Sequence, residues 1–134
     1  MAMEEHFFGD MRILEIDSPI ALKPYVGKYY LYEHADSHMK RRLFRALPNG
    51  MVELFLLFNG SRIIFLSNHG KKAYSGFVAG IFDLHHPMKV RLDANGGSFD
   101  GISVVFTHLG VNRILGVGLH ELTNAVFESS VFCH

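Results

Sequence analysis

The chain has 134 residues, the length of one domain with a hydrophobic core of its own. With 49% hydrophobic and 19% charged residues, its composition excludes an intrinsically disordered chain. Basic and acidic side chains balance, with 13 of each, so the chain lacks the basic surface that gives DNA-binding proteins most of their non-specific affinity.

Three further features bear on where the protein works. No apolar run reaches the roughly 18 residues that a membrane-spanning helix requires. Residues 1–6 have neither the basic nor the apolar region of a signal peptide. Cys133 is the single cysteine, so no disulfide can form within the chain. Together these features predict a cytoplasmic protein.

The N-terminal part of the chain divides into a lead and the start of a domain. Residues 1–10 show no periodicity and are predicted to form a flexible lead, and residues 11–134 are predicted to form one domain. The domain starts with a strand over residues 11–16. A short helix is expected after Asp17-Ser18-Pro19, because Asp or Ser can cap a helix and Pro suits its first turn.

A strand rich in tyrosine is predicted over residues 25–33. Successive side chains of a strand point to opposite faces of its sheet. Tyr30 and Tyr32 therefore share one face, while Tyr29 and Leu31 take the other.

The stretch around which the rest is organised is 47–60. It opens with Pro-Asn-Gly and closes with Asn59-Gly60, which are turn signals, and the apolar run between them has the length of a strand. Both faces of this strand are apolar, and one carboxylate, Glu53, lies in its middle. Such a carboxylate must be paired, hydrogen-bonded or shifted in pKa. Asn59-Gly60 predicts a tight hairpin into the strand at 62–66.

The second half of the chain adds strands and then helices. Further short strands are predicted at 74–80, 81–84, 88–92 and 99–107. From about residue 110, apolar residues recur at helical spacing: Val111, Ile114, Leu115, Leu119 and Leu122. Many short strands followed by helices indicate a mainly β fold, a small β-barrel or sandwich with two short C-terminal helices.

Several motifs follow one another in a recognisable order. They are Leu22-Lys23-Pro24-Tyr25-Val26 with Tyr29-Tyr30, Leu47-Pro48-Asn49-Gly50, Gly76-Phe77-Val78-Ala79-Gly80, Ile102–Phe106, Gly110–Gly116 and His120–Asn124. In order and spacing they resemble the N-terminal effector domain of one branch of the AraC-type transcription regulators. The likeness covers about residues 11–128. Two departures are Thr107-His108-Leu109, where the family often has a proline before the glycine, and the end of the chain at His134, where a helix-turn-helix domain would normally follow.

This resemblance implies a fold and a function. The barrel is expected to be cupin-like and to sense a small-molecule effector, whose identity the resemblance does not give. The chain is expected to form a homodimer, and DNA would be bound only through a helix-turn-helix domain that this chain lacks. The alternative is a stand-alone cupin-like enzyme or a small-ligand carrier.

Nine histidines invite a metal hypothesis, but their spacing does not favour it. His34 and His38 lie in a predicted loop without a third ligand at a diagnostic spacing, and Asn124 stands where a second histidine would follow His120-Glu121. The His-x-His of the enzymatic cupins does not occur, nor does a Gly-x-Ser-x-Gly nucleophile motif. We therefore predict no metal, no cofactor and no catalytic residue, and a protein that is not an enzyme.

The candidate ligand-binding residues are Glu53, Tyr30, Tyr32 and Arg45. Glu53 is either a structural carboxylate held by Arg45, Arg62 or backbone amides, or it points into the barrel and fixes a polar group of an effector. The two tyrosines either line the same cavity or are ordinary barrel packing.

The helical tail supplies the candidate dimer contacts. Leu115, Leu119 and Leu122 are predicted to lie at the interface with a second copy. The alternative is that these side chains are consumed by packing on the open end of the barrel itself.

Overall fold

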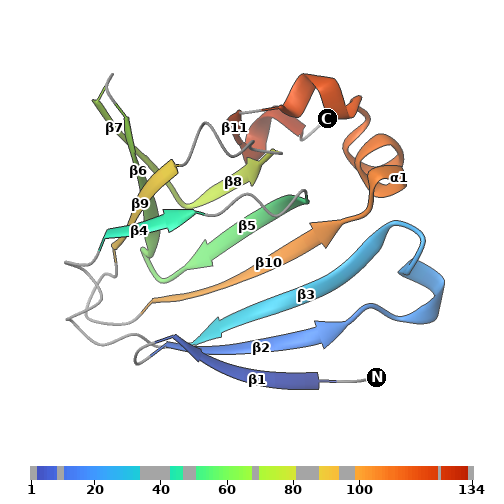
Figure 1. The fold of residues 1–134 in the computed structure, drawn as a ribbon, viewed down its shortest axis with the longest axis horizontal. Helices are drawn as coiled ribbons and strands as arrows, with labels where there is room; N and C mark the ends of the chain where they lie inside the picture. The colour runs from blue at the N-terminus through green and yellow to red at the C-terminus, as the bar shows by residue number, and fades with distance from the viewer. Residues whose placement is uncertain are drawn as a thin grey trace.

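Two antiparallel sheets face each other, and short helices lie at one end of them (Figure 1). The computed structural model describes residues 3–8, 11–33, 43–46, 51–67, 70–80, 88–93, 99–123 and 125–132. The predicted fold, a mainly β barrel or sandwich with short helices towards the C-terminus, is confirmed. Among the described residues, no helix has the length and apolar character needed to cross a membrane.

The larger sheet has the strand order β1-β2-β3-β10-β5-β8-β11. The bounds are β1 Met3–Phe8, β2 Met11–Asp17, β3 Val26–Glu33, β5 Val52–Phe58, β8 Gly76–Ala79, β10 Asp100–Phe106 and β11 Val126–Glu128. β10 lies between β3 and β5, so a late strand closes the centre of a sheet that early strands begin.

The smaller sheet has the order β4-β9-β6-β7. Its strands are β4 Leu43–Ala46, β6 Arg62–Ser67, β7 Gly70–Tyr74 and β9 Met88–Asp93. Each adjacent pair is antiparallel. The turn expected at 68–72 lies in part outside the described residues, and the strand expected at 81–84 lies outside them entirely. The same holds for residues 34–42, 47–50, 85–87 and 94–98.

The turn after β5 moves the chain from one sheet to the other. Asn59 and Gly60 have φ values of 57° and 76°, and the Ser61 N–H donates to the Phe58 carbonyl over 3.0 Å. These are the features of a type I′ turn, so the predicted tight turn is confirmed. The predicted hairpin pairing is wrong, because β5 belongs to the larger sheet and β6 to the smaller. β6 pairs instead with β7 and β9.

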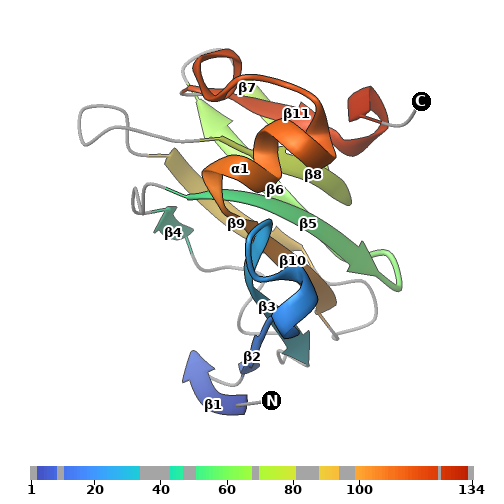
Figure 2. The ribbon, with the colours of Figure 1, turned by 90° about the vertical axis from the view of Figure 1, so that its right-hand side faces the viewer.

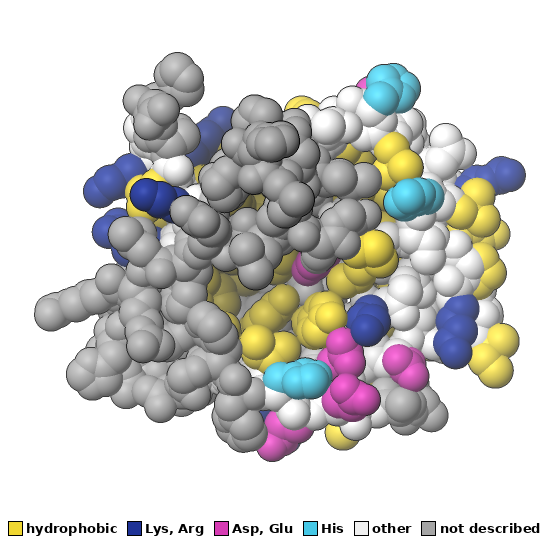
Figure 3. Space-filling view, in the orientation of Figure 1, with side chains coloured by type: hydrophobic (Ala, Val, Ile, Leu, Met, Phe, Trp, Pro, Cys, Tyr) yellow, Lys and Arg dark blue, Asp and Glu magenta, His cyan; other side chains and the backbone are white. Residues whose placement is uncertain are grey.

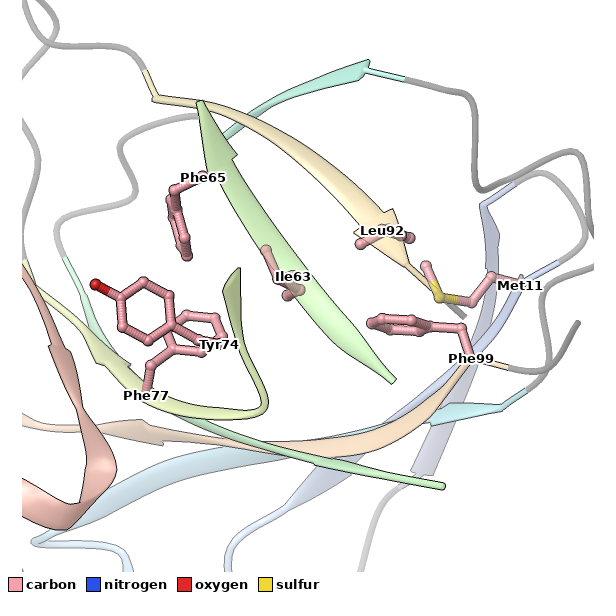
Figure 4. Close-up of a cluster of buried hydrophobic side chains, with 7 residues drawn as sticks. All are labelled: Met11, Ile63, Phe65, Tyr74, Phe77, Leu92 and Phe99. Carbon is pink, nitrogen blue, oxygen red and sulfur yellow. The ribbon is translucent and has the colours of Figure 1, made fainter. Parts of the chain in front are cut away.

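The first core cluster fills the space between the two sheets. Its buried members are Met11, Ile63, Phe65, Tyr74, Phe77, Leu92 and Phe99. Figure 4 shows side chains from the smaller sheet meeting those from the larger one across this space. The Phe77 ring is the hub of an aromatic group, with its centroid 4.8 Å from Phe55 and 5.2 Å from Phe65. Burial of these rings is what holds the two sheets together.

The second core cluster covers the opposite, outer face of the larger sheet. It joins strand residues to residues of the helical tail: Val26, Val52, Val78, Phe106, Val111, Leu115 and Leu122. Figure 2 looks onto the end of the molecule where these helices lie. Residues of the tail therefore cover part of the sheet's outer face.

The helical tail consists of short turns rather than long helices. α1 His108–Gly110 continues as a π-helical turn, η4 Val111–Leu115, and ends at Gly116, whose φ is 73°. The Thr107 hydroxyl accepts from the Gly110 N–H over 3.0 Å and donates to the Pro24 carbonyl over 2.6 Å. This cap ties the start of the tail to the loop before β3. The remaining 3-10 turns are η1 Ile20–Leu22, η5 Leu119–Leu122 and η6 Ser129–Phe132.

Two elements correct the predictions from sequence. The flexible lead predicted at residues 1–10 contains β1, which pairs with β2 from Met3 opposite Ile16 to Phe8 opposite Met11. This edge strand is held by backbone pairing with β2, which apolar periodicity does not reveal. β11 was not predicted either, because three residues are too few to show a pattern.

Candidate functional site

Strand alternation places the candidate residues on the inner face of the larger sheet. Phe55 of β5 lies opposite Ser103 of β10, and Ser103 lies opposite Tyr30 of β3. Glu53 and Tyr32 are each two residues away along their strands, so they share this face. The prediction that Tyr30 and Tyr32 share a face is confirmed, and the register puts Glu53 on that face as well.

A small apolar cavity lies between the sheets. Its volume is about 50 Å³. It is lined by Met11, Tyr32, Phe55, Leu57, Ile63, Leu92 and Phe99, and Figure 4 shows four of these side chains around it. Cavities with apolar walls stay dry and take up apolar molecules. The space is therefore suited to an apolar group rather than to ordered water.

One residue that lines this cavity, Tyr32, also takes part in a pair of hydroxyls. The Tyr32 hydroxyl lies 3.1 Å from the Ser103 Oγ, and either group can be the donor. Ser103 is fully buried. Burial, together with the carboxylate of Glu53, raises the pKa of the Tyr32 phenol well above its usual value. Tyr32 thus remains protonated and able to donate a hydrogen bond at physiological pH.

Tyr30 belongs to a second polar group beside the first. Its hydroxyl donates to Glu15 Oε1 over 2.9 Å, and Lys28 Nζ contacts the same oxygen at 3.1 Å. Lys28 and then Tyr30 lower the pKa of the Glu15 carboxyl. Burial, followed by the bond to Glu15, raises the pKa of Tyr30 to about 12. Tyr30 is therefore committed to Glu15, whereas Tyr32 faces the cavity.

Glu53 is less buried than its sequence context suggests. Its register positions are opposite Val105 on one side and Ala79 on the other, and its side chain is half-buried. Its carboxylate raises the pKa of both Tyr30 and Tyr32, so it lies within electrostatic reach of them.

The two arginines proposed to hold Glu53 are placed by the smaller sheet. Arg62 donates to Asp93 across the β6–β9 pair. Arg45 lies in β4 opposite Lys89, but its side chain is outside the described residues. Its predicted role in ligand binding stays a prediction.

The leucines predicted at a dimer interface pack inside the chain. Leu115 and Leu122 are 7% and 1% exposed, and Leu119 is half-buried against the same outer cluster. For Leu115 and Leu122 the structure thus corrects the dimer assignment in favour of the alternative, packing on the chain's own sheet. Among the described residues of the tail, the large apolar side chains that remain exposed are Leu109, Ile114 and Val131.

A further polar cluster was missed by sequence reasoning. Glu4 and His6 of β1 lie beside Glu15 of β2, and their ligand-type atoms all fall within 4.8 Å of one another. In Figure 3, histidine, acidic and basic side chains gather over the strands β1 to β3. The signal was the Glu4-x-His6 alternation, which puts two side chains on one face of a strand. It was overlooked because residues 1–10 were assigned to a flexible lead.

Comparisons with known proteins give only distant likenesses. No family model matches the chain, and no curated protein matches it. Among solved structures, the 7S globulin of Momordica charantia has a TM-score of 0.49 and 8% identity, covering 78% of this chain and 32% of that one. GK1651 from Geobacillus kaustophilus has a TM-score of 0.46 and 13% identity, covering 80% of this chain and 43% of that one.

A third likeness is to an S161A mutant of the oxalate decarboxylase OxdC from Bacillus subtilis. Its TM-score is 0.47 at 10% identity, covering 94% of this chain and 40% of that one. The chain thus spans less than half the length of each of these structures. Likeness of this degree says nothing about what the chain binds.

Proposed function

We propose that this chain is the ligand-sensing domain of a transcription regulator of the AraC type, built on a cupin-like barrel. The observation that carries the proposal is the apolar cavity between the sheets, whose lining residue Tyr32 also shares a hydrogen bond with the buried Ser103. Binding sites for small molecules are mostly apolar, with a few polar groups that fix orientation. The domain itself is not an enzyme, and it works in the cytoplasm.

The size of the cavity limits the effector. Its volume of about 50 Å³ is roughly a third of the ~150 Å³ of an engineered cavity that takes up benzene. The effector is therefore a very small apolar molecule, or it displaces part of the wall. Met11 is the wall residue best suited to move, because methionine side chains are unbranched and adaptable.

A shared strand supplies a route from effector to partner. On β10, Ser103 shares a hydrogen bond with Tyr32 of the cavity wall, while Phe106 packs in the outer cluster with Val111 of the tail. An effector that prefers one arrangement of β10 shifts the population of tail positions. In the regulator, the tail would pass this shift to a second copy in a homodimer and to a helix-turn-helix domain.

The test is a thermal-shift screen of small metabolites that carry an apolar body. An effector should raise the melting temperature of the wild type, because it binds the folded state only. Leu57→Phe, which fills the cavity, should remove the shift. The matched control Leu56→Phe changes the neighbouring residue on the opposite face of β5 and should keep it. A shift that survives Leu57→Phe would place the site elsewhere.

The same cavity would also suit a small-ligand carrier, so a further experiment must distinguish a sensor from a carrier. Sedimentation with and without the effector does this, because a sensor changes its association state and a carrier does not. The chain alone should not bind duplex DNA at physiological salt, since its formal net charge is zero. Tight, sequence-dependent binding by this chain would refute the domain assignment.

A further inference from the structure

The cluster on β1 and β2 has the donor set of a metal site. His6 Nε2 lies 3.6 Å from Glu4 Oε2 and 3.8 Å from Glu15 Oε2. These three atoms, one imidazole nitrogen and two carboxylate oxygens, converge on one point from two paired strands. Imidazole and carboxylate are the ligands that zinc and related ions take in proteins.

The register of the two strands puts like charges together. Glu4 lies directly opposite Glu15 in the β1–β2 pair. Two carboxylates in this position repel each other and weaken the strand pairing. A bound cation would turn this repulsion into a shared attraction.

The deeper carboxylate is held so that one oxygen is turned towards His6. Glu15 Oε1 accepts from Tyr30 at 2.9 Å and contacts Lys28 Nζ at 3.1 Å, while Oε2 faces His6. Carboxylates that bind metals are commonly oriented by hydrogen bonds of this kind from a second layer of residues. Glu15 is also the most buried of the three ligands, at 18% side-chain exposure against 50% for His6.

We propose that Glu4, His6 and Glu15 form a three-ligand site for a divalent transition-metal ion, with Zn²⁺ as the representative probe. In a tetrahedral zinc site with bonds of about 2.0 Å, neighbouring ligand atoms lie about 3.3 Å apart. The separations from His6 Nε2 are 3.6 and 3.8 Å, and the ligand atoms of the cluster all lie within 4.8 Å of one another, so rotations of the exposed Glu4 and His6 side chains would close the site. Three protein ligands leave the fourth position to water or to an exogenous ligand.

Equilibrium dialysis of Zn²⁺ against chelator-treated protein tests this site. His6→Ala should lose one bound equivalent, or bind it at least about ten-fold more weakly. Two matched controls should retain it: Glu5→Gln, one residue along β1 and paired with Arg12, and His120→Ala, an exposed histidine of η5. Binding that is the same in wild type and His6→Ala would overturn the proposal, as would no saturable binding in the wild type.

A second measurement tests Glu4 as a ligand. The difference in melting temperature between the wild type and Glu4→Gln should change sign when Zn²⁺ is added. In chelator, Glu4→Gln should melt at or above the temperature of the wild type, because it removes the repulsion with Glu15. With Zn²⁺ in excess, the wild type should melt higher than Glu4→Gln, because the ion binds the folded state only. Glu4 is 69% exposed in its side chain, so the variant is expected to fold. An identical zinc-induced rise in both proteins would remove Glu4 from the site.

Discussion

The two faces of the larger sheet use alternating residues of the same strands, and the cavity between the sheets lies on the inner one. On the outer face, Val52 and Phe106 are 1% and 3% exposed beneath the helical tail. On the inner face, Phe55 and Leu57 are half-buried and border the cavity at Tyr32. The outer face is covered by the helical tail, and the inner face borders a cavity and carries the Tyr32–Ser103 hydroxyl pair.

We expect the outer face to contribute mainly to stability and the inner face to contribute to ligand binding. A closed cluster resists change, because tightly packed side chains must shift together. A face with a cavity and hydrogen-bond donors has room to accept a further molecule. Because the side-chain period of a strand is two, neighbouring residues of β5 and β10 contribute to the two roles in turn. Substitutions on one face should therefore affect stability most, and substitutions on the other should affect binding.

The largest expected effect comes from matched leucine truncations on the two faces. Leu122→Ala empties a fully packed outer site and should lower the free energy of unfolding by about 3–5 kcal/mol. Leu57→Ala lies beside an existing cavity and should cost about 2–3 kcal/mol while enlarging that cavity. Urea unfolding of both variants measures the difference. Equal losses, or a larger loss for Leu57→Ala, would remove the distinction between the faces.

The next prediction concerns the close contact between Gly110 of α1 and the backbone of Tyr25, just before β3. A Cβ added at Gly110 would overlap the carbonyl oxygen of Tyr25. Gly110→Ala should therefore cost about 1–3 kcal/mol. In Gly27→Ala the new methyl would lie 3.8 Å from the Val105 carbonyl oxygen, an ordinary contact. That control should leave stability unchanged or raise it by up to about 1 kcal/mol.

Urea unfolding again decides this prediction, with the alanine at position 27 measured beside the alanine at position 110. If Gly110→Ala were as stable as the wild type, the α1 turn could move away from Tyr25 at little cost. The tail would then be a loose cover rather than an anchor, and the route from β10 to the tail would be weakened with it.

Sequence patterns predicted the strands of this fold well where periodicity was strong. Turn signals on both sides of the apolar run located β5 and showed that Glu53 and Phe55 share a face. The tyrosine-rich segment likewise put Tyr30 and Tyr32 together. These inferences held because alternation is a local property that each strand carries in its own residues.

What sequence could not supply was pairing between distant segments. The change of sheet at Asn59-Gly60 depends on which strands β5 and β6 meet, and a turn signal fixes only the turn. The meeting of His6 with Glu15 depends on the register of β1 against β2. The burial of Leu122 depends on a sheet face built from strands far away along the chain.

A smaller effect is expected from the hydroxyl pair at the cavity. Tyr32→Phe removes one partner of the buried Ser103 hydroxyl and should cost about 1 kcal/mol. Ser103→Ala should cost a similar amount, and the double variant should cost less than the sum of the two. The coupling in this double-mutant cycle should be about 0.5–1.5 kcal/mol. Additive losses would show that the two hydroxyls do not interact.

The smallest effect is a pH dependence carried by Tyr32. Burial and the Glu53 carboxylate raise its folded-state pKa above the ordinary value of 10.0. Above pH 10.0 the unfolded chain therefore loses this proton before the folded chain does, and stability falls as the pH rises. Below that pH the contribution of Tyr32 is complete and constant.

Comparing wild type with Tyr32→Phe isolates this contribution, because the other titrating groups are common to both proteins. The difference in their free energies of unfolding should be constant from about pH 7 to about pH 9 and should shift against the wild type above pH 10. Ultraviolet difference spectra of the two folded proteins should show one tyrosine fewer titrating in Tyr32→Phe. The missing tyrosinate signal should be one that appears above pH 10 in the wild type. A difference that stays flat through pH 11 would mean that Tyr32 titrates alike in both states. Its phenol would then be in water rather than buried beside Ser103, and Tyr32 would not be the wall residue that the proposed binding site needs.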